Sequence, residues 1–288
     1  MHLKEVKGIL SAQNGMNISR GCTHGCIYCD SRSKCYRIEH DFEDVEIKSN
    51  APQLLEDALK RKRKKCVVGT GAMSDPYIPL PENLANIRAC LEIIDKYGCG
   101  LAIQTKSDLI LRDLDLLVSI NEKAKCVVQM TMTTFDEKLC KIIEPNVCAT
   151  QRRFEVLKIL RENGIKTIVW LCPFLPYIND TEENLRGLLD YCAEAGVYGI
   201  LWWGIGMTLR EGSREYFYKN LDRHFPGLKS AYQKKYGLDY IITSDNNEKL
   251  MKLFNETCDK RRIAYGNDAL FEYMRVFEEK KGAQMGLF

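Results

Sequence analysis

Three cysteines near the start of the chain are the residues whose type and spacing most clearly indicate chemistry. Cys22, Cys26 and Cys29 follow the pattern C-x3-C-x2-C, in a loop that also contains Gly21 and Gly25. Three closely spaced thiolates can hold three corners of a cubane iron–sulfur cluster, whereas a fourth cysteine would complete its ligation. Because the local count stops at three, one iron would keep an open coordination position, which is typical of a reactive metal site.

Three other interpretations of this loop explain less. A structural zinc site usually combines two Cys/His pairs, and His24 lies between the first two cysteines without a second pair. A disulfide would need an oxidising compartment. Free cysteines can pack as small hydrophobic residues, but packing alone does not explain three of them within eight residues beside two glycines. The pattern therefore favours the open cluster.

With Tyr28 directly before the third cysteine, the motif resembles that of the radical S-adenosylmethionine (SAM) superfamily. The longer string over residues 19–32 resembles one branch of it, the spore photoproduct lyase-like or "DNA repair photolyase" group. The resemblance implies a [4Fe–4S] cluster on the three cysteines and SAM as a second cofactor. Reduction by an external one-electron donor, of the flavodoxin or ferredoxin type, would cleave SAM to a 5′-deoxyadenosyl radical that abstracts hydrogen from a substrate. Tyr28 and Asp30 are expected to line the cofactor site.

Composition is that of an ordinary globular protein. The chain has 288 residues, is 45% hydrophobic and 28% charged, and carries a net charge of +3. It has no apolar run long enough for a membrane span, and its first residues lack the apolar core of a signal peptide. The thirteen cysteines are an odd number, and those outside the loop are scattered. We therefore expect a reducing cytoplasmic location and no membrane association.

The elements that must position the loop alternate along the chain. Helix-like segments separate strand-like segments from about residue 50 onwards, which is typical of a parallel β/α architecture. The six expected strands cover residues 16–19, 66–69, 100–104, 126–131, 167–171 and 199–203. Six units are too few for an eight-fold barrel, and the pattern alone leaves a doubly wound sheet open. The resemblance favours a partial (β/α)6 barrel over residues 1–226, with a mostly helical C-terminal extension over residues 227–288.

Polar residues follow the expected strands at the edge where ligands bind in parallel β/α folds. Ser74 and Asp75 follow the second strand, Lys106 follows the third, and Thr131 ends the fourth. Asp75 is suited to the amino group or a ribose hydroxyl of SAM. The resemblance implies that Lys106 contacts the methionine portion, and that Thr131 stands where the family has a cofactor-binding serine. Taken alone, each residue also fits ordinary turn or surface chemistry.

Further elements complete the expected cofactor pocket. Glu144 precedes Arg152 and Arg153, an arrangement that resembles the family's Glu-Pro…Arg element, and Arg153 is favoured as the partner of Glu144 in an ion pair. The proline-rich segment 173–180 resembles a family segment near the adenine. Arg210, after the sixth strand, is a candidate substrate contact.

One departure from the lyase pattern bears on the substrate. In spore photoproduct lyase, a cysteine two residues before the Ser-Asp serine donates a hydrogen atom, and the matching position here is Ala72. Cys35, beyond the cluster loop, is the only candidate replacement we identify. A nucleic acid substrate other than spore photoproduct is therefore expected first. A peptide or small metabolite is the alternative, and a non-enzymatic iron–sulfur electron carrier or zinc-binding module is a third hypothesis.

Two segments bear on nucleic acid and its associated proteins. The basic run over residues 60–65 is better explained as the solvated end of a helix, at the amino edge of the sheet, than as a phosphate contact. The terminus containing Gln284, Met285, Leu287 and Phe288 resembles the short peptide by which bacterial DNA-maintenance proteins bind the sliding clamp. The clamp is therefore a candidate partner.

Overall fold

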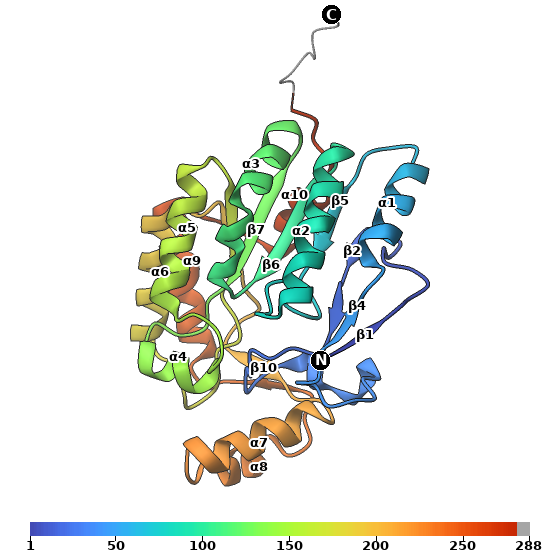
Figure 1. Cartoon of the computed structure of the whole chain (residues 1–288). Helices are drawn as coiled ribbons and strands as arrows, with labels where there is room; N and C mark the ends of the chain where they lie inside the picture. Colours follow the sequence, from blue (N-terminus) through green and yellow to red (C-terminus); the bar gives the residue numbers. More distant parts are fainter. Residues whose placement is uncertain (281–288) are drawn as a thin grey trace, which may run out of the picture.

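The computed structural model describes residues 1–280, and a parallel sheet of seven strands forms its centre (Figure 1). The strand order is β12-β9-β8-β7-β6-β5-β2, and every neighbouring pair is parallel. The strands are β2 (Gly15–Met16), β5 (Val67–Thr70), β6 (Gly100–Thr105), β7 (Cys126–Thr131), β8 (Lys166–Trp170), β9 (Gly199–Leu201) and β12 (Ala264–Tyr265). All six residues of β7 are buried, as expected for a parallel strand covered on both faces.

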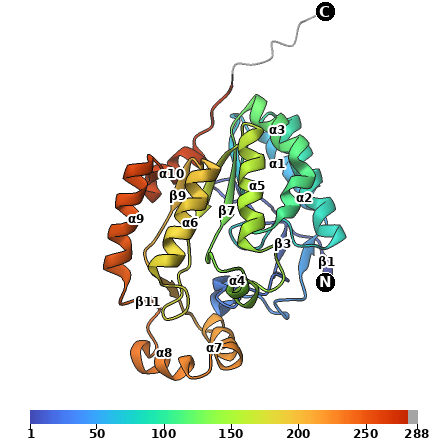
Figure 2. The same ribbon diagram turned by 90° about the vertical axis from the view of Figure 1, so that its left-hand side faces the viewer.

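Helices cover the outer face of this sheet (Figure 2). In chain order they are α1 (Ala51–Arg61), α2 (Pro81–Lys96), α3 (Leu114–Lys123), α5 (Thr150–Glu162) and α6 (Glu182–Ala195). The short helix α4 (Glu137–Ile143) lies below them (Figure 2) and packs against the cysteine loop. Local signals define their ends: the Thr181 side chain caps the start of α6 by accepting a hydrogen bond from Asn184 N, and Gly196 ends it in the left-handed conformation. The alternation of strand and helix confirms the predicted partial barrel.

The C-terminal part contributes more to the sheet than its sequence predicts. It contains α8 (Leu228–Tyr236), α9 (Asn247–Arg261) and α10 (Asn267–Arg275), and also the short strand β12, which pairs with β9. Two residues among charged neighbours leave no local strand signal, so β12 exists only because β9 offers a free edge. The division of the chain after residue 226 stays a prediction.

Two small sheets lie at the carboxyl edge of the large one. Strands β1 (His2–Lys4), β4 (Glu46–Lys48) and β3 (Ser19–Arg20) form the first, and β10 (Gly206–Thr208) with β11 (Ile241–Thr243) forms the second. Helix α7 (Ser213–His224) packs with α8 below them (Figure 1). Within residues 1–280, no helix combines the length and apolar character needed to cross a bilayer.

Candidate active site

The loop with the three cysteines follows β3 at the carboxyl edge of the large sheet. Its conformation depends on Gly21, whose φ of 83° favours glycine and where a side chain would collide with the carbonyl oxygen of Phe42. That carbonyl oxygen accepts a hydrogen bond from Cys22 N at 2.9 Å. Buried Ser74 holds the same segment, since its hydroxyl donates to the carbonyl oxygen of Gly21 and lies 3.1 Å from Ser19 Oγ.

The three thiols are buried or half-buried, and their sulfur atoms are not all close enough to bind a single metal ion. Cys26 is buried, and Cys22 and Cys29 are half-buried. Burial raises the pKa of Cys22 to about 12 and the pKa of Cys26 well above its usual value, so metal binding must release protons. Among residues 1–280, the three sulfur atoms do not all lie within 4.8 Å of one another. This spread fits a multi-atom cluster better than a single zinc ion.

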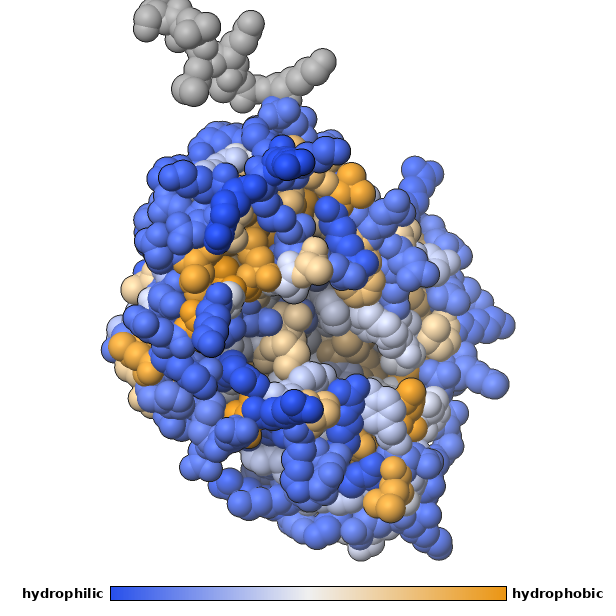
Figure 3. Space-filling view, turned by 90° about the vertical axis from the view of Figure 1, so that its right-hand side faces the viewer, coloured by the Kyte–Doolittle hydropathy of each residue, from blue (hydrophilic) through white to orange (hydrophobic). Residues whose placement is uncertain are grey.

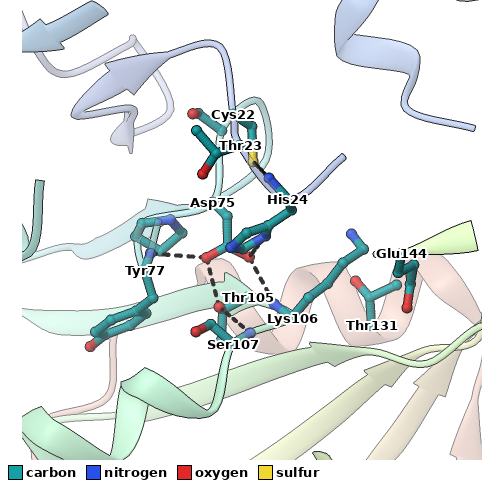
Figure 4. A network of polar contacts seen from close by, with 12 residues as sticks. Cys22, Thr23, His24, Asp75, Tyr77, Thr105, Lys106, Ser107, Thr131 and Glu144 are labelled. Atoms are coloured by element: carbon teal, nitrogen blue, oxygen red, sulfur yellow. Dashed lines mark hydrogen bonds and ion pairs between the residues drawn. The ribbon is translucent and has the colours of Figure 1, made fainter. Parts of the chain in front are cut away.

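Asp75 connects the cluster loop to the ends of β5 and β6 (Figure 4). Its carboxylate accepts hydrogen bonds from Thr105 Oγ1 at 2.7 Å, Lys106 N at 2.8 Å and Tyr77 N at 2.9 Å. His24 Nδ1, from the cluster loop, lies 3.5 Å from Asp75 Oδ2. The carboxylate is thus already engaged by protein donors, which indicates a positioning role.

His24 is a site residue that the sequence analysis considered only as a zinc ligand. It is 2% exposed, and its backbone N lies 3.5 Å from Cys22 Sγ. Burial lowers the pKa of His24. Its place in the cluster loop was a visible signal, but its contact with Asp75 arises only when β5 is packed beside the loop.

Lys106 and Thr131 present polar groups without protein partners. The Lys106 side chain extends toward Thr131 and Glu144 (Figure 4), and within residues 1–280 no carboxylate lies within 4 Å of its Nζ. Burial opposes its charge, but the negative charges of the Cys26 thiolate form and of the Glu144 carboxylate outweigh burial and raise the pKa of Lys106. Thr131 Oγ1 is buried and has no hydrogen-bond partner in the described part of the chain. Such groups in a native interior call for a ligand or water.

A buried ion pair lies beside these groups and confirms the predicted pairing. Arg153 Nη1 lies 2.6 Å from Glu144 Oε2, and neither side chain is exposed. The hydroxyl of Tyr28 donates to the second oxygen of Glu144, and Arg153 also donates to the carbonyl oxygen of Thr131 at 3.0 Å. Arg152 instead lies at the surface, paired with Asp108 at 3.0 Å. The arginine of the Glu-Pro…Arg element is therefore Arg153.

Asp30 belongs to a separate cluster on the other side of the cysteine loop. Its carboxylate accepts hydrogen bonds from Tyr36 Oη at 2.9 Å and Thr208 Oγ1 at 3.1 Å. Arg210 Nη1 lies 3.8 Å from Asp30 and 3.2 Å from the sulfur of exposed Cys35. The structure thus brings Arg210 and Cys35 together with Asp30, apart from the group around Lys106.

One cavity lies on the inner face of the large sheet, and a second is lined mainly by the N-terminal sheet of β1, β4 and β3. The first, of about 250 Å³, is lined by Ala72, Gln104, Gln129, Trp170 and residues of α10. The second, of about 460 Å³, is lined by Lys4, Arg20, Gly21, Glu46, Lys48 and neighbours, and Asn17 lines both. The face of the molecule that carries β1 and β4 is hollowed near its centre (Figure 3).

The sequence model of the radical SAM superfamily matches residues 16–192, which is more than half of the chain and includes all three cysteines. The chain belongs to the radical SAM superfamily. Its cofactors are accordingly a [4Fe–4S] cluster and SAM. Within residues 1–280, three thiols that are buried or half-buried, a lysine without a counterion and an unpartnered hydroxyl at the carboxyl ends of the strands fit these two groups.

Two similar proteins, one bacterial and one archaeal, are described as uncharacterized proteins. A Mycobacterium tuberculosis protein is 28% identical over 255 residues, covering 86% of this chain and 74% of its own. A Methanocaldococcus jannaschii protein is 35% identical over 164 residues, covering 56% of this chain and 60% of its own. These relatives add no substrate or partner.

Solved structures show the fold. A spore photoproduct lyase mutant aligns with a TM-score of 0.66 at 14% identity, covering 91% of this chain and 78% of its own. The lyase complexed with dinucleoside spore photoproduct aligns with a TM-score of 0.62 at 14% identity, covering 86% of this chain and 74% of its own. The radical SAM methyltransferase TsrM from Kitasatospora setae aligns with a TM-score of 0.51 at 15% identity, covering 68% of this chain and 37% of its own.

Proposed function

We propose that Cys22, Cys26 and Cys29 hold the [4Fe–4S] cluster and that the chain cleaves SAM reductively to start hydrogen abstraction from a substrate. The observation that carries this proposal is the convergence of three shielded thiols with the unpartnered Nζ of Lys106 and Oγ1 of Thr131 at one edge of the sheet. When bound, the two cofactors supply an electron and a sulfonium whose cleavage yields a carbon-centred radical. The protein's part is to bind, orient and shield them.

The residues divide this work between contact and positioning. Lys106 pairs with the carboxylate of SAM, and the Thr131 hydroxyl hydrogen-bonds to the same cofactor. The ion pair of Arg153 and Glu144 forms one wall of the cofactor pocket, and the Tyr28 hydroxyl connects that wall to the cluster loop by its hydrogen bond to Glu144. Ser74 and Asp75 position the loop and the end of β6. Asp30 organises the outer cluster with Arg210.

The direct test is anaerobic reconstitution of the cluster, reduction with dithionite or a flavodoxin- or ferredoxin-type donor, and assay for 5′-deoxyadenosine. Formation of this product is expected in the presence of SAM. A fully loaded, reduced protein that forms none would contradict the enzyme and favour an electron carrier.

Replacing Lys106 with methionine is expected to raise the KM for SAM about tenfold to a hundredfold. The reason is that a hydrogen bond to a charged group contributes about 1.5–3 kcal/mol. The KM is measured from 5′-deoxyadenosine formation at increasing SAM concentration. Lys65→Met is the matched control, because Lys65 lies at the opposite edge of the sheet and pairs with Glu279 at the surface. Equal KM values for the two variants would refute this role for Lys106.

A nucleotide-like substrate is favoured by the chemistry of the two cavities. The first is bordered by Trp170, which lies 4.9 Å from the exposed ring of Trp203, and such rings can stack on a base. The second contains Arg20 and Lys48, whose charges attract a phosphate. The solved lyase complex with a dinucleoside has the same fold. Because Ala72 replaces the donor cysteine, we propose a substrate other than spore photoproduct.

The substrate class can be tested by binding of single-stranded oligonucleotides at moderate salt. Wild-type protein is expected to bind, and Trp203→Ala is expected to bind about fivefold or more weakly, because stacking contributes about 1–3 kcal/mol per base. Phe135→Ala is the control, because Phe135 is also an exposed aromatic residue but its ring packs on Tyr191 instead of Trp170. Absence of binding by the wild type would favour a peptide or small metabolite, the alternative supported by Ala72 and the small net charge.

The candidate clamp-binding peptide lies outside the described residues and stays a prediction, as does the cytoplasmic location. A pull-down with the sliding clamp compares the full chain with a chain that lacks residues 284–288. Retention of only the full chain is expected. Equal retention of both would rule out this peptide as the contact.

A further inference from the structure

Two histidines and a glutamate converge on the N-terminal sheet, outside the cysteine cluster. His2 of β1 and Glu46 of β4 are direct neighbours in the parallel pair, and His40 comes from the loop before β4. One ligand atom from each of the three lies within 4.8 Å of the others. His2 Nε2 is 3.9 Å from Glu46 Oε2, and the two imidazole rings are 4.9 Å apart.

The outer contacts of both imidazoles leave Nε2 available as a ligand. His2 Nδ1 lies 3.0 Å from Asp44 Oδ2, and His40 Nδ1 lies 2.9 Å from the carbonyl oxygen of Asp41. A carboxylate and a carbonyl only accept hydrogen bonds, so both Nδ1 atoms carry the hydrogen, and in a neutral ring the lone pair is then on Nε2. Metal-binding histidines are oriented in this way by a carboxylate or a backbone carbonyl.

One buried nitrogen in this group of three residues lacks a hydrogen-bond partner in the described part of the chain, and it lies beside a buried carboxylate. His40 Nε2 is inaccessible to solvent and has no hydrogen-bond partner within residues 1–280. Glu46 is 3% exposed, and its ion-pair partner Lys4 is an exposed side chain that reaches Glu46 Oε2 at 2.7 Å. A buried nitrogen without a partner beside a buried carboxylate is the environment that a cation would satisfy.

We propose that His2 Nε2, His40 Nε2 and the Glu46 carboxylate bind a zinc ion, with water in the fourth position. Two nitrogens and a carboxylate oxygen are ordinary zinc ligands at about 2.0–2.2 Å. The ligand atoms must approach one another by up to roughly 1.5 Å for these bonds to form. His40 lies on a loop, and Lys4 can leave Glu46 at small cost because that ion pair is partly solvated.

The ion would stabilise the segment of chain against which the cysteine loop packs. Zinc would link β1, β4 and the loop after His40, and that loop contains Phe42, whose carbonyl oxygen accepts the hydrogen bond from Cys22 N. The His40 ring also lies against Gly21, where an added side-chain carbon would be 3.7 Å from His40 Cε1. The role of the ion is thus structural, and Glu46, which also lines the second cavity, would be one of its ligands.

The experiment uses full-length enzyme with a complete [4Fe–4S] cluster and no added histidine tag. Zinc is added anaerobically, unbound metal is removed, and zinc and iron are counted by elemental analysis. One zinc per chain is expected in addition to the cluster iron. Zinc-edge X-ray absorption should show nitrogen and oxygen ligands near about 2.0–2.1 Å and no sulfur near about 2.3 Å.

Variants separate this site from chance binding. His40→Gln should weaken zinc binding at least about tenfold. Asp44→Asn, which weakens both the outer contact of His2 and the ion pair of Asp44 with the N-terminal amine, should weaken zinc binding about 10–100-fold. His224→Gln, on α7, is the matched control and should bind as the wild type does. The proposal is overturned if the loaded enzyme binds no zinc, if sulfur ligates the zinc, or if the His40 and His224 variants bind it equally.

Discussion

Replacing Cys22 with alanine is expected to abolish both the iron–sulfur cluster and the cleavage of SAM. With three thiols in the loop and none to spare, loss of one leaves a cluster with two protein ligands, which the loop cannot retain. Iron per chain and 5′-deoxyadenosine after reduction are the two measurements.

Cys35→Ala is the matched control for this prediction. Cys35 lies on the same segment of chain but is exposed, and its sulfur contacts Arg210 instead of the group around Lys106. The Cys35 variant should keep a full cluster and cleave SAM. If the Cys22 variant retained wild-type iron and cleavage, the proposed ligand set would be wrong.

Replacing Arg153 with methionine is expected to lower the free energy of unfolding by about 3–5 kcal/mol. The substitution keeps much of the side-chain volume but leaves the carboxylate of Glu144 buried without its cation. It also removes the donors that satisfy the carbonyl oxygens of Thr131 and Cys148. Urea-induced unfolding of the cluster-loaded protein under anaerobic conditions measures the loss.

Arg152→Met provides a comparison at the neighbouring position. Arg152 is 43% exposed and pairs with Asp108 and Glu155 at the surface, so its loss should cost at most about 1 kcal/mol. A loss for the Arg153 variant no larger than this would show that the buried pair contributes little.

The same ion pair makes stability depend on pH. Burial would raise the pKa of Glu144, but the cations of Arg153 and Lys106 outweigh it and hold that pKa below its usual value. A group with a lowered folded-state pKa stabilises the protein above the unfolded-state value of about 4.3, and this contribution disappears as the pH falls through the folded-state pKa. A Glu144→Gln variant should lack this part of the acid-induced loss.

The local sequence was informative wherever short-range chemistry decides the outcome. The C-x3-C-x2-C spacing predicted a cluster loop, and the alternation of apolar strands and capped helices predicted six of the seven parallel strands of the large sheet. Glu144 and its arginine were predicted to form an ion pair, which the structure confirms for Arg153. These features depend on spacing within one segment, where side-chain periodicity, turn residues and ligand geometry are visible.

Tertiary structure decided the features that join distant segments. The pairing of β12 with β9, the engagement of Asp75 by donors from β6 and the cysteine loop, and the meeting of His2, His40 and Glu46 all require strands to be packed side by side. None leaves a local pattern, because each contact is created by the edge or register of a strand elsewhere in the chain. The cysteine loop itself was evident from the sequence by spacing alone, whereas the set of side chains that surround it depended on the folded sheet.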